Sequence, residues 1–148
     1  MANEYYRSPV GILKIVSDGN AITEISVSDI GVSEADELTA EAVRQLTEYF
    51  DGKRTKFELP INPDGTAFCR RVWQILTEIP FGKAFSYGQV AELTGNKQAC
   101  RAIGNAVGNN PILIVIPCHR VVAKNSIGGF SAGIEIKKFL LKHENISI

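Results

Sequence analysis

The stretch Ile112-Leu-Ile-Val-Ile-Pro-Cys-His-Arg-Val-Val122 is the part of the chain around which the rest is organised. Its apolar, mostly β-branched flanks predict buried extended chain, and its four middle residues are expected where that chain meets water. A cysteine reacts as a thiolate and needs a nearby base or cation, which His119 and Arg120 supply. Neighbours on extended chain point to opposite faces, so we expect His119 to reach Cys118 through a water or a tight turn. A buried, inert Cys118 stays open as an alternative.

The composition is that of a soluble globular protein. The 148 residues suffice for one ordinary domain or two small ones, and 45% are hydrophobic and 22% charged. No apolar run approaches the length of a membrane span, and the first residues lack a basic-then-apolar signal peptide. We therefore expect a cytoplasmic protein, nuclear if eukaryotic, that does not bind membranes.

Cysteine and histidine usage argues against metal binding. Cys69, Cys100 and Cys118 are an odd number without C-x-x-C spacing, which disfavours a disulfide framework and a cysteine-based zinc site. His119 and His143 are the only histidines, and no cluster of carboxylates accompanies them. The sequence predicts no metal and no cofactor.

The two halves of the chain differ in charge although the total is zero. Residues 1–65 carry 6 Lys or Arg and 12 Asp or Glu, whereas residues 66–148 carry 10 and 4. A basic second half fits a polyanion such as nucleic acid, but an ordinary solvated surface explains the asymmetry equally well without a motif.

The first half predicts a small antiparallel sheet and a helix. Extended segments are expected at 5–9, 11–17 and 21–27, with a turn at Asp18-Gly-Asn20. Ser33-Glu-Ala-Asp36 is an N-cap pattern, and 55–59 predicts one more strand. The helix after the N-cap ends at Asp51-Gly52 and carries an apolar stripe of Leu38, Val43, Leu46 and Phe50. Two prolines and a glycine make 60–65 a linker between domains at 1–59 and 66–148.

The second half predicts mostly helices. A first helix, ended by Pro80-Phe-Gly82, carries the stripe Phe68, Val72, Ile75, Leu76 and Ile79 with Trp73 alongside. Ser86 with Gln89 forms a capping box for a short helix through Thr94, and Asn96 is expected to cap another through about Val107. Two short helices joined by a Gly/Asn turn match a helix-turn-helix, although any αα-corner has the same pattern.

A helix-turn-helix presents the start of its second helix to DNA. That position puts Lys97, Gln98 and Arg101 forward, with Asn105 one turn later. An alternative stays open for Arg101, namely that it is an ordinary solvated cation on the surface. The small-residue loop 124–133 then allows a flat ligand near backbone N–H groups, and 134–144 predicts a helix with Ile136, Phe139, Leu140 and Leu141 inward.

With these residues in place, the chain resembles the O6-alkylguanine-DNA alkyltransferases, which are suicide DNA-repair proteins. The resemblance covers most of residues 66–148 in the family's order, and the first half resembles the family's variable domain. It implies an α/β (α+β) fold, with a small N-terminal RNase H-like antiparallel sheet with helices and a mostly helical C-terminal winged-helix/helix-turn-helix domain. The matching segments are Phe81–Ala91, Arg101–Ala106, Asn110-Pro111, Ile116–Val122, Gly129–Ser131 and Leu140–Glu144.

The resemblance implies direct repair in a single turnover. Cys118 accepts an alkyl group from O6 of guanine in double-stranded DNA, with O4 of thymine left open as a second target. His119 acts as base through a bridging water, and Glu144 orients His119. Arg120 is expected to make structural hydrogen bonds. We expect a monomer.

The resemblance also implies roles for residues that handle the DNA. The guanine is flipped out through the minor groove, and Arg101 fills the gap that it leaves. Tyr87 contacts the adjacent phosphate and bounds the pocket. Asn110 forms a hinge between recognition helix and active-site strand. Phe130 and Ser131 bound the guanine pocket, and Phe130 departs from the tyrosine of many relatives, so a hydroxyl is missing there.

Other classes of protein remain open. A sequence-specific helix-turn-helix regulator does not explain Pro117–Arg120. A Cys-His hydrolase would turn over a small ester or peptide. An alkyltransferase-like module binds lesions without repairing them, but those relatives have tryptophan in place of the cysteine, so Cys118 indicates a chemically active protein.

Overall fold

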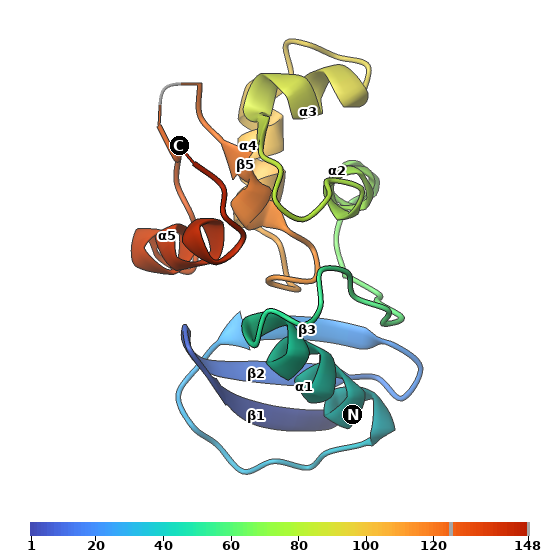
Figure 1. The fold of residues 1–148 in the computed structure, drawn as a ribbon. Helices are drawn as coiled ribbons and strands as arrows, with labels where there is room; N and C mark the ends of the chain where they lie inside the picture. Colours follow the sequence, from blue (N-terminus) through green and yellow to red (C-terminus); the bar gives the residue numbers. More distant parts are fainter. Residues whose placement is uncertain (125, 148) are drawn as a thin grey trace. The chain divides into compact units, whose positions relative to one another are not determined.

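The computed structural model describes residues 1–124 and 126–147, and within it the chain divides into two units (Figure 1). The first unit holds Met1–Asp64 together with Pro111–Leu113. The second holds Gly65–Asn110 and Ile114–Ile148. Residues 60–64 of the expected linker lie in the first unit, and so does the Pro111–Leu113 tripeptide, which the expected contiguous domains had placed in the second half.

The first unit is built on a three-stranded antiparallel sheet in the order β1-β2-β3. The strands are β1 (Ala2–Ser8), β2 (Gly11–Ser17) and β3 (Ile22–Val27). The turn expected between the last two is confirmed: Asp18 accepts hydrogen bonds from the N–H groups of Asn20 (2.8 Å) and Ala21 (2.9 Å).

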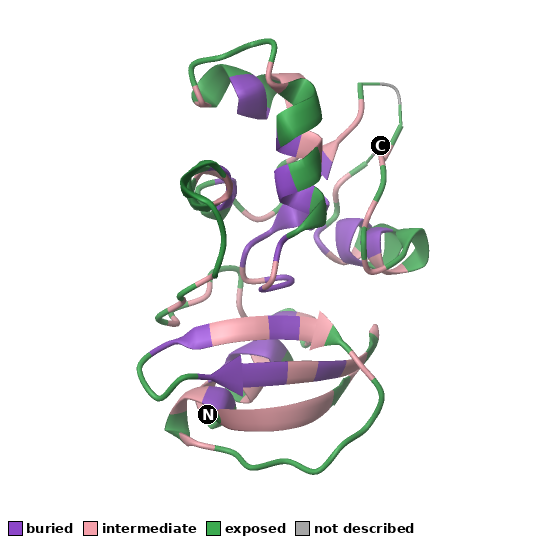
Figure 2. Ribbon diagram, turned by 180° about the vertical axis from the view of Figure 1, so that it is seen from behind, coloured by how far each residue is buried: buried purple, intermediate pink, exposed green. Residues whose placement is uncertain are grey.

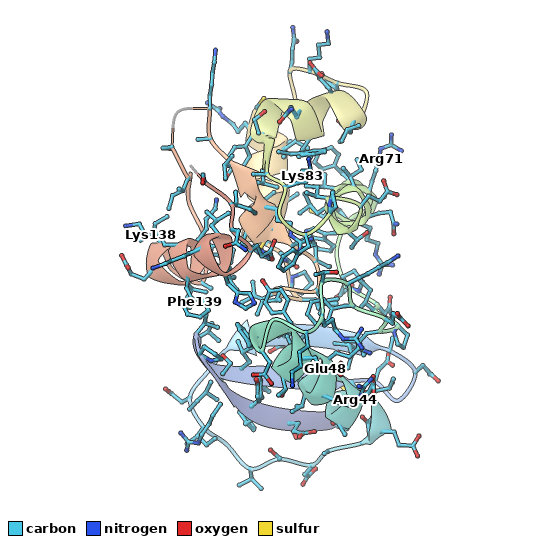
Figure 3. All side chains as sticks on the ribbon, viewed as in Figure 1. Arg44, Glu48, Arg71, Lys83, Lys138 and Phe139 are labelled. Atoms are coloured by element: carbon cyan, nitrogen blue, oxygen red, sulfur yellow. The ribbon has the colours of Figure 1, made fainter. Side chains whose placement is uncertain are left out.

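Helix α1 (Glu37–Phe50) packs against this sheet. Its N-cap is Asp36, the last residue of the expected N-cap pattern, and not Ser33, whose Oγ accepts from the Tyr5 N–H (3.0 Å). Asp36 accepts from the Thr39 N–H (2.8 Å), and the Asp36 N–H donates to Thr39 Oγ1 (2.9 Å). The expected apolar stripe is wrong in part, because the buried face includes Thr39 and Gln45, whose polar groups are hydrogen-bonded. The buried residues of α1 are Thr39, Ala42, Gln45, Leu46 and Tyr49. On the exposed face Arg44 pairs with Glu48 at 3.2 Å (Figure 3).

The strand expected at 55–59 is absent. The Gln45 side chain instead binds both backbone groups of Glu58: its amide donates to the Glu58 carbonyl (3.1 Å) and its oxygen accepts from the Glu58 N–H (2.9 Å). A side chain therefore satisfies the backbone groups that a sheet would otherwise pair.

Two short segments cover the free edge of β3. Ile22 exchanges hydrogen bonds with Pro60 (2.8 Å) and Asn62 (2.9 Å), so part of the expected linker pairs with the sheet. Ile25 does the same with Pro111 (2.9 Å) and Leu113 (2.9 Å). An edge that would otherwise present unpaired backbone groups is thereby covered.

Helices make up most of the second unit. It contains α2 (Ala67–Thr77), β4 (Phe85–Ser86), α3 (Tyr87–Leu93), α4 (Cys100–Gly108), a 3₁₀ turn η1 (Cys118–Arg120), β5 (Val121–Val122) and α5 (Ile134–His143). Helices α2, α3 and α4 pack together. The buried Trp73 indole donates to the Ala106 carbonyl (2.9 Å), and Figure 2 shows both buried and exposed residues along α4.

The helix pair differs from its prediction at one end. The Ser86–Gln89 capping box is confirmed by reciprocal bonds of 3.1 and 2.7 Å. Helix α4, however, begins at Cys100 and not after Asn96. Asn96 Oδ1 accepts from the Gln98 N–H (3.0 Å) and so caps a tight turn. Lys97 and Gln98 therefore lie in that turn, before the helix.

Two further expectations are corrected in this unit. Helix α5 buries Lys137 with Leu140 and Leu141, whereas Phe139 is 39% exposed. Ile112–Ile116 is mostly buried but does not form a strand, because Ile114 has a left-handed φ of 71°. That conformation is strained for a β-branched residue and turns the chain before Cys118.

None of the helices in residues 1–124 and 126–147 combines the length and apolar character that crossing a bilayer requires. In the same ranges no three His, Cys, Asp or Glu side chains gather as metal ligands would.

Candidate active site

Cys118 lies in a tight turn and not on extended chain. Pro117 has φ −82° and ψ 64°, and the Cys118 N–H donates to the Ile116 carbonyl (2.8 Å), which is an inverse γ-turn. The 3₁₀ turn η1 follows at once. The alternation of faces expected from a strand therefore does not apply, and the turn buries Cys118, His119 and Arg120 together, with exposures of 1%, 0% and 5%.

His119 is paired with Glu144, the residue that follows α5. His119 Nε2 lies 2.7 Å from Glu144 Oε2, and both side chains are fully buried. A carboxylate can only accept, so Nε2 carries the proton of this hydrogen bond. The other ring nitrogen, Nδ1, is buried and has no hydrogen-bond partner among the described residues. The neutral ring thus offers one free lone pair.

Arg120 fixes the same carboxylate from a second side. Its Nε and Nη2 donate to Glu144 Oε1 (2.8 Å) and Oε2 (3.1 Å), and Nη1 donates to the Ile79 carbonyl (2.7 Å) at the end of α2. The expectation that Arg120 makes structural hydrogen bonds is confirmed. Burial alone would raise the pKa of Glu144, but the hydrogen bonds from His119 and Arg120 outweigh it and lower that pKa, so the carboxylate is ionised.

The resting sulfur is a neutral thiol. Burial raises the pKa of Cys118 to about 11, opposed by a hydrogen bond from Asn110 and by the charge of Lys137. Burial also lowers the pKa of His119, although Glu144 acts in the opposite direction, so the imidazole is neutral. The neutral imidazole can therefore accept the proton of the neutral thiol. In the resting protein the sulfur is the thiol and not the thiolate.

Asn110 joins the end of α4 to the turn with the sulfur. It is buried, follows the C-cap residue of α4, and its Nδ2 donates to the Ile116 carbonyl (2.8 Å). The side chain therefore spans the loop 111–115 and holds the two ends of that loop together.

Lys137 is a site residue that sequence reasoning missed. Its Nζ donates to the carbonyls of Val121 (2.7 Å) and Gly129 (3.0 Å), which fixes the loop after β5 to α5. Burial lowers the pKa of Lys137 to about 8, and Cys118 acts against that. A signal was present: residues 137, 140, 141 and 144 follow helical i, i+3, i+4, i+7 spacing. Lysine is rarely buried, which concealed it.

Comparison with known proteins identifies the family. The family described as "6-O-methylguanine DNA methyltransferase, DNA binding domain" matches residues 67–146, and the corresponding "ribonuclease-like domain" matches residues 1–63. A methylated-DNA–protein-cysteine methyltransferase of Haemophilus influenzae is 44% identical, over 96% of this chain and 85% of that protein. One of Methanosarcina acetivorans is 40% identical, over 94% and 95%. This chain belongs to the 6-O-methylguanine DNA methyltransferase family.

Solved structures of this methyltransferase family have the same fold. The O6-methylguanine methyltransferase of Mycobacterium tuberculosis superposes with a TM-score of 0.89 at 34% identity, over 97% of this chain and 92% of that one. The same protein in complex with DNA also gives 0.89, over 98% and 93%. The α/β fold with two parts that the resemblance implied is confirmed.

Tyr87 is a predicted pocket residue that lies against the loop after β5. It is half-buried at the start of α3, and burial, followed by the charge of Cys118, raises its pKa. A methyl group built on Gly128 would lie 3.2 Å from Tyr87 Oη and from the Ala123 nitrogen. Gly128, with φ 77°, therefore lets the loop after β5 pass close to this ring.

The remaining predicted site residues are exposed or half-buried. Arg101 and Asn105 are exposed on α4, Phe130 is half-buried and Ser131 exposed. Lys97 and Gln98 are exposed in the preceding turn. Other exposed cations of the second unit include Arg71, Lys83 and Lys138, which are labelled in Figure 3. The structure thus brings Cys118, His119, Glu144 and Asn110 together and holds Tyr87 half-buried against the loop after β5. It leaves the other predicted DNA contacts, Lys97, Gln98, Arg101 and Asn105, facing solvent.

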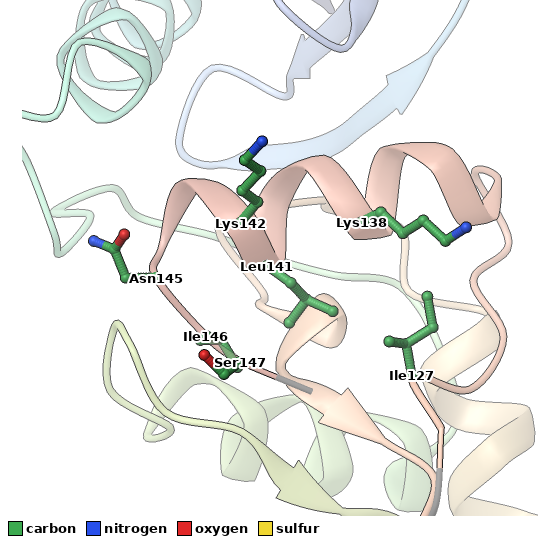
Figure 4. A pocket seen from close by; sticks show the side chains of 7 residues that line it. All are labelled: Ile127, Lys138, Leu141, Lys142, Asn145, Ile146 and Ser147. Atoms are coloured by element: carbon green, nitrogen blue, oxygen red, sulfur yellow. The ribbon is translucent and has the colours of Figure 1, made fainter.

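A cavity of about 390 Å³ lies beside α5 (Figure 4). Its lining includes Leu141, Lys142, Asn145 and Ile146, but not Cys118. It is therefore distinct from the surroundings of the enclosed sulfur.

Proposed function

We propose that this protein repairs O6-alkylguanine in double-stranded DNA by moving the alkyl group onto Cys118 in a single turnover. The observation that carries the proposal is the buried His119–Glu144 pair at 2.7 Å, in which His119 lies in the same turn as the thiol and keeps a free Nδ1 lone pair. Membership of the methyltransferase family and the relatives' names support the reaction class.

The proton of Cys118 goes to His119. Ionised Glu144 holds the Nε2–H, so Nδ1 is the nitrogen that accepts, through the bridging water that the resemblance implies. The raised pKa of the thiol keeps it protonated until substrate is present. The ammonium of Lys137 favours the thiolate as it forms.

The transfer is an in-line displacement at carbon. The Cys118 Sγ–C bond forms as the C–O6 bond breaks, and guanine leaves as an anion. The anion takes up the proton that left the thiol, so Cys–SH and O6-methylguanine give Cys–S–CH₃ and guanine. The thioether product has no carbonyl for water to attack, and the protein is therefore consumed by one reaction. O4 of alkylated thymine offers the same leaving group and is proposed as a second target.

The lesion must leave the duplex to reach an enclosed sulfur. A stacked base cannot present O6 to a thiol that is 1% exposed, so the nucleotide is flipped out. Arg101, exposed on α4, fills the gap with its long planar guanidinium. Tyr87 contacts the adjacent phosphate. The backbone contacts come from Lys97, Gln98 and Asn105, and they make binding dependent on salt.

The base enters against the loop after β5. Phe130 and Ser131 belong to that loop and bound the guanine, and Asn110 acts as the hinge that fixes the recognition helix to the sulfur turn. Because Phe130 carries no hydroxyl, Ser131 or a backbone N–H donates toward the leaving guanine. The relative from Mycobacterium tuberculosis was solved with DNA, which supports a DNA substrate.

The test is intact mass after incubation with duplex DNA containing O6-methylguanine. Stoichiometric gain of one methyl group, absent in Cys118→Ala, is the expected result. Binding without mass gain would select a lesion-binding module or a helix-turn-helix regulator. Repeated turnover of a small ester or peptide would select a Cys-His hydrolase.

A further inference from the structure

Helix α5 ends in a left-handed residue, Asn145, which follows the C-cap residue Glu144. Asn145 has φ 59°, its N–H donates to the Lys142 carbonyl (3.0 Å), and the Ile146 N–H donates to the Leu141 carbonyl (2.9 Å). This pair of bonds is the Schellman motif, in which a residue after the C-cap adopts the left-handed conformation. Leu141 and Ile146, which the motif brings together, both line the cavity in Figure 4.

Glu144 is the C-cap residue of this motif. Its carboxylate faces His119 and Arg120, and Oε1 also lies 3.4 Å from the Gly82 N–H. The end of a helix carries partial negative charge, which disfavours a carboxylate there. The Glu144 carboxylate therefore does not stabilise α5. The backbone conformation that directs this carboxylate toward His119 must be stabilised by other groups.

The same motif ends two other helices, and both use glycine. At the end of α1, Gly52 (φ 76°) donates to the Tyr49 carbonyl (3.1 Å) and Lys53 to that of Glu48 (2.8 Å). Gly95 (φ 90°) plays this part after α3. Glycine and asparagine adopt the left-handed region at low cost, whereas a β-branched residue does not.

We propose that Asn145 is a positioning residue for the reaction: its left-handed backbone ends α5 so that the Glu144 carboxylate meets His119 Nε2. The inference rests on the proposed function for its link to repair. Asn145 is exposed, and its backbone N–H bonds α5, so its influence on the sulfur passes through Glu144. The identity of the residue after Glu144 then controls which nitrogen of His119 is free to take a proton.

The experiment compares Asn145→Gly, Asn145→Ala and Asn145→Val with the wild type. Gly52→Asn and Gly52→Val apply the same asparagine-to-valine step in the first unit, at the end of α1, which carries none of the proposed site residues. All proteins are studied well below their melting temperatures, with folding checked by circular dichroism. The first readout is the ¹⁵N spectrum of the His119 imidazole, assigned with His143→Gln. The second is the rate of methyl gain on Cys118 from duplex DNA.

Asn145→Gly is expected to match the wild type in both readouts. Asn145→Val should weaken the Nε2–H tautomer of His119 and slow methyl gain by about tenfold, with Asn145→Ala between them. Gly52→Val should lower the melting temperature without changing either readout. An unchanged His119 spectrum in folded Asn145→Val or Asn145→Ala overturns the inference.

The two proposals fail separately. If the wild type gains no methyl group, the proposed function is wrong, and the His119 spectrum still decides whether Asn145 positions Glu144. If the wild type gains the methyl group and Asn145→Val does so at the wild-type rate and with the wild-type spectrum, repair stands and the role of Asn145 is refuted.

Discussion

Asn110 Nδ2 donates a 2.8 Å hydrogen bond to the Ile116 carbonyl, and the sulfur of Cys118 accepts another from the same side chain. One buried amide thus ties the end of α4 to the turn that carries the thiol.

Replacing Asn110 by alanine should cost stability and reactivity together. The Ile116 carbonyl loses its side-chain donor in a buried setting, which costs ~1–3 kcal/mol in the free energy of unfolding. Loss of the bond to sulfur should raise the pKa of Cys118 further and slow methyl gain. Chemical denaturation and intact mass measure the two effects. The exposed neighbour Asn105 gives a matched control, since Asn105→Ala should change stability by less than ~0.5 kcal/mol.

Glu144→Gln should remove the anion that His119 and Arg120 share. A buried guanidinium then lacks its counter-charge, so we expect a loss of ~3–5 kcal/mol in the free energy of unfolding. The thiol should also react more slowly with simple alkylating agents, because His119 loses its orienting partner. Glu135→Gln on the same helix, whose carboxylate is exposed, is the control. Unchanged thiol reactivity in folded Glu144→Gln would remove Glu144 from the relay.

Stability should fall in acid because of the same carboxylate. The folded-state pKa of Glu144 lies below its usual 4.5, so the unfolded chain binds a proton first as pH falls. The stabilisation from Glu144 is therefore complete above about pH 4.5 and is lost progressively below it. Melting temperature against pH measures this loss. The profile of Glu144→Gln should be flatter than that of Glu135→Gln in the acid range, and equal slopes would contradict the assignment.

The three thiols should differ in accessibility. Cys100 is exposed, Cys69 is intermediate and Cys118 is buried with a pKa near 11. A bulky aromatic disulfide reagent should therefore modify Cys100 first and Cys118 last, which peptide mass mapping would resolve. Rapid modification of Cys118 in the folded protein would show that its sulfur is open to solvent and would contradict the enclosed site.

Arg101→Ala should separate DNA handling from chemistry. Methyl gain from duplex DNA should slow by at least about tenfold, whereas reaction with the free base O6-methylguanine should stay near the wild-type rate, because the free base needs no extrusion. Lys97→Ala, in the turn before α4, should weaken binding and its salt dependence only slightly. Equal losses on both substrates in Arg101→Ala would count against a base-flipping role.

Local signals in the sequence were sufficient for much of the fold. The capping pattern located the start of α3 at Ser86 and that of α1 to within three residues, at Asp36 and not Ser33, since a cap depends on residues three apart. Long-range partners were not visible. Gln45 replaced a strand by binding Glu58, and Pro111–Leu113 joined the first unit through Ile25. Such pairings depend on tertiary contacts that no local pattern encodes.

The sequence predicted which residues form the candidate site better than it predicted how they are arranged. The motif supplied Cys118 and His119, and the resemblance added Glu144, which lies 2.7 Å from His119. The β-branched run suggested a strand, but a left-handed Ile114 and an inverse γ-turn replaced it, so the pairing of side chains could not be worked out from alternation. Lys137 escaped notice because burial of an ammonium requires acceptors that only the fold supplies.

The pairing of Pro111–Leu113 with the edge of β3 has a consequence for protein engineering. A fragment cut after Asp64 would leave these three residues without the Ile25 backbone groups that they bind. Their apolar side chains, two of them buried in the full chain, would then face water immediately beside Asn110. A chimaera that joins the second unit to a foreign domain must therefore provide another strand edge with which this tripeptide can pair.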